Sequence, residues 1–258
     1  VERTSNVLLK AIEEPPPRTV WLLCAPSAED VVVTIRSRSR ALALRVPPVA
    51  DVAALLVARD GIAPEVAEAA ARAAQSHVGL ARRLARDPAA RERRSRTLEL
   101  AAGIRGVGDA VLAAADLVEV ATAESKAATE DRDAAEKAAL LHTLGAEDSQ
   151  TLPPTLRAQV RQLEEDQKRR ATRALRDELD RAALDLLSMY RDVLVVQLGA
   201  GVELINPEQD VHRPSAESTP EQTLRRMDAI GEARTRLAGN VAPLLAMEAM
   251  AVALRPQV

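Results

Sequence analysis

The chain has 258 residues and a net charge of −3, and it is 47 % apolar but only 1 % aromatic, with no Phe, one Trp and one Tyr. A core of Ala, Val and Leu favours closely packed helices and argues against an all-β fold, whose strands prefer β-branched and aromatic residues. Trp21 and Tyr190 are far apart in the sequence, which excludes a base-stacking platform for single strands. The small net charge gives the chain no bulk attraction to a polyanion.

Residue types that carry chemistry are scarce. Cys24 is the single cysteine, so an intrachain disulfide and a thiolate metal cluster are excluded, and its place in an apolar run predicts a buried, inert thiol. The histidines at 77, 142 and 212 are not at metal-ligand spacing. We therefore expect neither a metal nor a cofactor. No apolar run reaches the roughly 20 residues of a membrane span, and we find no signal peptide, so we expect a cytoplasmic protein without a membrane partner.

Residues 1–46 form the only stretch with a mixed α/β pattern. It predicts two helices and two strands, in the order helix 6–14, strand 19–25, short helix 28–36 and short strand 41–46, of which the strand 19–25 is expected to be buried on both faces. Prolines 15–17 end the first helix. Such a piece cannot bury itself alone, so we expect the chain to be the N-terminally truncated part of a longer protein.

The rest of the chain is predicted to be helical. Residues 47–88 hold three helices of about ten residues with short loops, which is typical of a small bundle. In residues 89–258 the pattern predicts helices over 91–104, 109–144, 156–198, 221–237 and 240–254. Gly145 and Asn240 are the expected caps of two of them. The predicted fold class is mainly α, with an α/β remnant at the N-terminal end.

Nucleotide-binding motifs are not found in the sequence. No Gly-x-x-x-x-Gly-Lys-Ser/Thr phosphate loop occurs in the chain. The glycines at 103, 106 and 108 have the spacing of a dinucleotide fingerprint, but they follow a predicted helix rather than a strand, so we expect a loop between helices.

Two segments carry the strongest signal. Residues 6–17 read Asn-Val-Leu-Leu-Lys-Ala-Ile-Glu-Glu-Pro-Pro-Pro, and residues 34–40 read Thr-Ile-Arg-Ser-Arg-Ser-Arg. Together they resemble the clamp-loader branch of the AAA+ ATPases, which carries Asn-x-Leu-Leu-Lys-x-x-Glu-Glu-Pro-Pro, a strand and then Thr-Ile-x-Ser-Arg-Cys. The resemblance implies that residues 1–46 are the last part of the AAA+ core, 47–88 a helical lid and 89–258 a helical collar for oligomerisation.

The resemblance also suggests a functional residue. Ser37, Arg38 and Ser39 fall on the Ser-Arg-Cys motif, with Ser39 in place of the usual Cys. In the family this arginine reaches the ATP of a neighbouring subunit, where a guanidinium stabilises charge that develops on the γ-phosphate. The residues themselves agree with an exposed basic segment, because Arg36, Arg38 and Arg40 alternate with no acidic partner nearby in the sequence.

The positions of the family's nucleotide sensors indicate which kind of subunit the chain resembles. The first sensor falls at Ala25 or Pro26, neither of which can bind a phosphate through its side chain. The second falls at Gly79, and we expect Arg82 and Arg83 on the solvated face. An arginine finger without sensors resembles the delta-prime subunits of bacterial DNA polymerase III, and residues 181–194 and 240–254 resemble their collar helices.

That resemblance implies an ATP-inert stator without independent enzymatic activity, in a holoenzyme that is a nucleotidyltransferase. The implied partners are the gamma/tau and delta subunits and, indirectly, the sliding clamp and primed DNA. The alternatives are a gamma/tau-like ATPase motor subunit of the same loader and a helical scaffold with no nucleotide link. A third is direct DNA binding through the arginines at 91, 93, 94 and 96, which we expect on a solvated face. The helices over 109–170 match no motif, and we expect their charges to be solvated too.

Overall fold

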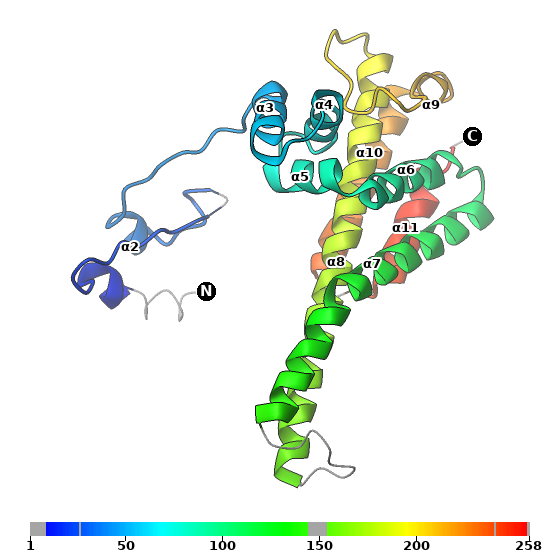
Figure 1. Cartoon of the computed structure of the whole chain (residues 1–258). Coiled ribbons are helices and arrows are strands. Elements are labelled where there is room, and N and C mark those ends of the chain that lie inside the picture. Colours follow the sequence, from blue (N-terminus) through cyan, green and yellow to red (C-terminus); the bar gives the residue numbers. More distant parts are fainter. Residues whose placement is uncertain (1–8, 26, 144–153, 240, 257–258) are drawn as a thin grey trace. The chain divides into compact units, whose positions relative to one another are not determined.

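The computed structural model describes residues 9–25, 27–143, 154–239 and 241–256. The chain divides into two units, Val1–Pro47 and Pro48–Val258, and Figure 1 labels their helices. The described residues are mainly helical, as predicted. Among the helices of these ranges, none has both the length and the apolarity needed to cross a bilayer.

The first unit has little regular structure. Residues 9–13 are helical, and α2 covers Val33–Arg36. The two predicted strands, 19–25 and 41–46, are wrong for the described residues, which carry no strand there. A strand satisfies its backbone groups only by pairing with another strand, and neither segment has one. Their apolar side chains are consequently exposed, Leu44 by 94 %, and the thiol of Cys24, predicted to be buried, is exposed as well.

The second unit begins with three short helices, α3 (Val49–Asp60), α4 (Pro64–Ala73) and α5 (Val78–Arg86). Local residues define their ends. Gly61 follows α3 in the left-handed conformation, with φ of 66°, and the His77 ring accepts a hydrogen bond from the Leu80 amide at the start of α5. The three helices share one apolar cluster centred on Val52, Leu56 and several alanines.

The larger part of the second unit consists of α6 (Pro88–Ala102), α7 (Val107–Thr143), α8 (Pro154–Gln197), α9 (His212–Ala216), α10 (Pro220–Ala238) and α11 (Pro243–Leu254). Helix α8 packs against α6, α7, α9 and α10, and α11 packs against α7 and α10. A second apolar cluster lies between these helices. The shared helix α8 therefore organises this part of the fold.

The structure refines several predicted boundaries. The Asp87 carboxylate accepts a hydrogen bond from the Ala89 amide at 2.9 Å, so α6 starts three residues before the predicted position. Gly103 is the C-cap of α6 and Gly106 precedes α7, in agreement with a loop between helices, but the prediction is wrong for Gly108, which lies in the first turn of α7. The short helix α9 lies within a segment predicted to be a loop. The expected caps Gly145 and Asn240 lie outside the described residues.

Tyr190 lies in the core of the second unit and is the only tyrosine of the chain. Burial raises the pKa of its phenol to about 12, and the charge of Arg226 opposes this rise. The Arg226 guanidinium lies 5.9 Å from the ring centroid. Between pH 10 and pH 12 the folded state therefore keeps a proton that the unfolded state has lost.

We predict that this tyrosine ionises near pH 12 in the folded chain and near pH 10 in denaturant. The free energy of unfolding should fall as pH rises through this window, because the unfolded state binds fewer protons there. Ultraviolet absorbance of phenolate reports this one residue directly. A folded-state midpoint near pH 10 would contradict the prediction.

Candidate functional site

The Ser37-Arg38-Ser39 segment follows directly on α2. Ser37 is the C-cap of this helix, and the Arg38 and Ser39 amides donate to the Ile35 and Arg36 carbonyls at 3.1 and 3.2 Å. The Ser39 hydroxyl, which replaces the thiol of the usual motif, donates to the Ile35 carbonyl at 2.9 Å. The segment is therefore a tight turn held by its own backbone and hydroxyl groups.

The Arg38 side chain is 44 % exposed, and its acidic partner is distant in the sequence, in keeping with the absence of one nearby. Its Nε lies 2.5 Å from Oε1 of Glu13, and its Nη1 donates to the Thr34 carbonyl at 2.9 Å. Glu13 belongs to the other motif segment, residues 6–17, so the structure brings the two segments together. An exposed ion pair of this kind contributes about 1 kcal/mol or less, which leaves the guanidinium easy to redirect.

The flanking arginines differ from Arg38. Arg36 donates to the Ala28 carbonyl at 3.3 Å, and Arg40 is exposed. Of the two sensor positions, Ala25 is exposed, Pro26 lies outside the described residues, and Gly79 lies near the start of α5.

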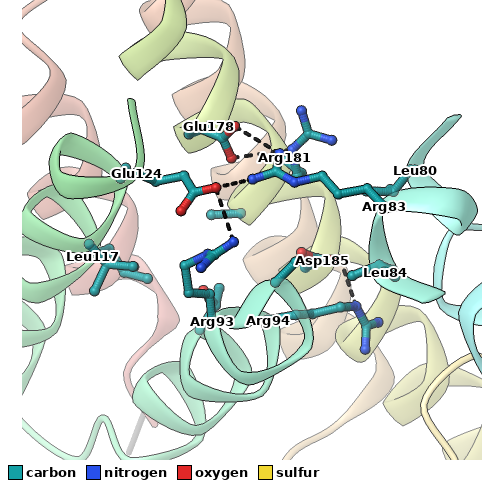
Figure 2. Close-up of a pocket in the computed structure, with 15 residues that line it drawn as sticks. Leu80, Arg83, Leu84, Arg93, Arg94, Leu117, Glu124, Glu178, Arg181 and Asp185 are labelled. Carbon is teal, nitrogen blue, oxygen red and sulfur yellow. Dashed lines mark hydrogen bonds and ion pairs between the residues drawn. The ribbon is translucent and has the colours of Figure 1, made fainter. Parts of the chain in front are cut away.

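A second group of charged side chains joins α5, α6, α7 and α8 (Figure 2). Glu124 of α7 lies between two arginines, Arg83 of α5 and Arg93 of α6, and pairs with both. Arg83 also pairs with Glu178 of α8 at 3.0 Å. Arg83 was predicted on a solvated face. The structure corrects this, because acidic side chains of α7 and α8 hold its guanidinium and the side chain is 30 % exposed. Arg82, in contrast, is exposed and pairs with Asp60 at 3.0 Å.

Arg94 is the most buried member of this group, with 8 % of its side chain exposed. Its Nε donates to Asp185 of α8 at 2.9 Å, and its Nη2 donates to the Asn206 amide oxygen. Burial raises the pKa of the Asp185 carboxyl, and Arg94 opposes that rise. The predicted solvated face is therefore wrong for Arg93 and Arg94, while Arg91 and Arg96 are exposed as expected.

The same network fixes the segment after α8. Asp192 is fully buried and accepts hydrogen bonds from the Ile205 and Asn206 amides at 3.0 and 2.7 Å. The partners of Arg94 are 91 and 112 positions away in the sequence. No local pattern could have revealed them.

The geometry of this second group indicates a structural role. The crevice that it lines has a volume of about 60 Å³, which has room for water but not for a nucleotide, whose pockets measure about 300–1,000 Å³. Its arginines are already paired with carboxylates. In the ranges that the structure describes, no cluster of His, Cys, Asp or Glu could hold a metal ion. The Arg38 segment is therefore the better candidate for a functional site.

Comparison with known families points to the same segment. Residues 1–48 match the family described as DNA polymerase III, delta subunit. The match ends one residue beyond the first unit and includes both motif segments. It supports a family related to the DNA polymerase III clamp loader for this part of the chain. A comparison with curated proteins gives no match.

We predict that Arg94→Ala lowers the free energy of unfolding by about 3–5 kcal/mol, because it leaves a buried carboxylate without its charge partner. Urea denaturation measures the change. Arg96→Ala on the exposed side of the same helix is the matched control and should cost about 0.5 kcal/mol or less. Equal losses for the two variants would contradict a structural role for the Arg94 network.

Proposed function

We propose that this chain is a delta-prime-type subunit of a bacterial DNA polymerase III clamp loader, acting in the cytoplasm during DNA replication. In this proposal it does not hydrolyse ATP. It donates Arg38 to the ATP held by an adjacent ATPase subunit while the sliding clamp is loaded on primed DNA. The observation that carries the proposal is the family match over residues 1–48, which contain Arg38 on an exposed turn.

The chemistry of Arg38 suits this role. A guanidinium that contacts the γ-phosphate stabilises the charge of the transferring phosphoryl group, and such arginines contribute about 10³–10⁵ to the rate. The ion pair with Glu13 is half-exposed on both sides and costs little to exchange for a phosphate, which binds a guanidinium in bidentate geometry. The short turn at Ser37–Ser39 limits the positions that the Arg38 backbone can adopt.

The rest of the chain has features that suit a lid and a collar. Helices α3–α5, with Ala90 of α6, share one apolar cluster, and α6, α7, α8, α10 and α11 contribute to another, in keeping with a lid over residues 47–88 and a collar over 89–258. Helix α11 leaves Leu244 and Leu245 exposed, and such side chains suit contact with the gamma/tau or delta subunits. In this proposal the second unit holds the subunit in the ring.

The identity of the residues at the nucleotide-sensor positions supports an ATP-inert role. Ala25 and Gly79, which fall on the sensor positions of the family, offer no side-chain ligand for a phosphate. A gamma/tau-like motor subunit would require ATP hydrolysis by the chain itself. A scaffold without a nucleotide link would leave the ATPase activity of the loader unchanged, whether or not it assembled with the other subunits.

We expect Arg38→Ala to lower the DNA-stimulated ATPase activity of the assembled loader. Hydrolysis at the ATP site that faces Arg38 should slow by on the order of a thousandfold or more. The total rate of the loader should therefore fall by the fraction that this site contributes. Co-elution with the other loader subunits should be unchanged. Single-turnover hydrolysis with the reconstituted complex measures the effect.

Two matched variants sharpen this test. Arg40→Ala removes an exposed arginine two residues away and should leave hydrolysis unchanged. Glu13→Gln removes only the exposed partner of Arg38 and should change the rate by no more than about fivefold, since the ion pair is weak. Unchanged ATPase and clamp loading in Arg38→Ala would refute the proposed finger, and failure to co-elute would refute loader membership.

A further inference from the structure

The two longest helices continue beyond the core of the second unit as an arm (Figure 1). The apolar cluster of this unit includes residues of α7 only as far as Ala121 and residues of α8 only from Leu175 onward. We call residues 126–143 of α7 and 157–173 of α8 the arm. Their charges are distributed unevenly between the side on which the two helices meet and the outer side of α8.

Three acidic side chains of the arm form ion pairs between its helices, whereas Glu130 and Asp131 of α7 are exposed. Asp133 and Glu136 of α7 both pair with Arg170 of α8. Lys137 of α7 lies 2.7 Å from Glu164 of α8, and the Gln167 amide donates to the Asp133 carbonyl at 2.9 Å. These contacts compensate the negative charge of α7 on the inner side.

The outer side of α8 is basic. Its exposed cations lie within about 160° of the helix circumference at 3.6 residues per turn, and they are Arg157, Arg161, Lys168, Arg169 and Arg173. We call these five residues the basic face. Two acids interrupt this face, because Glu165 lies within the arc and Asp166 lies at its edge. They form only long pairs of 3.6 and 3.7 Å with Arg161 and Arg169, whose side chains are 82 % and 73 % exposed. In the ranges that the structure describes, the other three cations have no carboxylate partner.

We propose that the basic face binds the sugar–phosphate backbone of double-stranded nucleic acid, independently of base sequence. The face is about 24 Å long, since a helix rises about 1.5 Å per residue, and a B-form strand presents a phosphate about every 3.4 Å along its axis. A guanidinium group can donate two parallel hydrogen bonds to the oxygens of one phosphate. The whole chain has a net charge of −3. The attraction to the phosphates of the duplex therefore comes from the local concentration of cations on the basic face and not from the net charge.

Base stacking has no part in this contact. The only two aromatic residues of the chain are Trp21, outside the arm, and Tyr190, which is buried. The run at 91–96 is a poorer candidate, because Arg93 and Arg94 are already occupied by carboxylates. The inference does not rest on the proposed role of Arg38.

The test is fluorescence anisotropy of a labelled 20-base-pair duplex titrated with the 258-residue chain over a range of salt concentrations. The test variant combines Arg157→Gln, Arg161→Gln, Lys168→Gln and Arg173→Gln. We expect its affinity to fall on the order of tenfold or more, and its slope of log affinity against log salt to become shallower by about 3 to 4, because each neutralised phosphate contributes about 0.9. The control variant combines Arg86→Gln, Arg96→Gln, Arg213→Gln and Arg225→Gln, all exposed outside the arm, and should bind like the parent chain.

A second variant separates charge from folding. Arg157→Lys, Arg161→Lys and Arg173→Lys keep the charge of the basic face and should retain the salt slope. The proposal is overturned if the parent chain shows a slope near zero, if the control variant loses as much affinity as the test variant, or if the lysine variant loses the slope. It is also overturned if polyglutamate of equal charge displaces the chain as well as unlabelled duplex does, because the face would then suit an acidic protein equally.

Discussion

Close packing of helices through small side chains is the constraint on which the second unit depends. Alanines supply almost half of the buried apolar residues in the described part of the chain. Helix α7 contributes Ala110, Ala113 and Ala114 and packs against α11, which contributes Ala246 and Ala251. Small side chains let helix axes approach closely, but each buries little apolar area. Larger side chains are needed for contacts between helices that alanine cannot span, and the chain has no Phe to provide them.

Arginine side chains form many of these longer contacts between helices. Arg83, Arg94 and Arg234 each extend to a carboxylate on another helix, and Arg234 joins α10 to Asp180 of α8 at 2.6 Å. A long aliphatic stem covers apolar surface while the guanidinium forms several directed bonds. The same residue type therefore serves different purposes in one chain. Arg94 is enclosed by its partners and holds helices together, whereas Arg38 is half-exposed beside one weak partner and can exchange it.

The helices could be predicted closely because their determinants are local. Proline begins α4, α6, α10 and α11, and Thr219 with Gln222 forms a capping box before α10. The strands could not be predicted from the same kind of signal. The run from residue 19 to 25 is apolar enough for a buried strand, but burial and pairing depend on neighbouring strands that its own residues do not specify. Cys24 is exposed because no other strand of the described residues covers this run.

The sequence by itself determined the helix periodicity, the helix ends and the motif that includes Arg38, since each depends on residues a few positions apart. Only the tertiary structure decided which arginines are structural and which are available. The Ser37-Arg38-Ser39 turn is local, but its contact with Glu13 requires the chain to fold back. Arg93 and Arg96 belong to one basic run, and their surroundings differ because one faces α7 and the other faces solvent. Charge pairing between distant segments depends on where the helices cross, and side-chain packing over the whole unit determines those crossings.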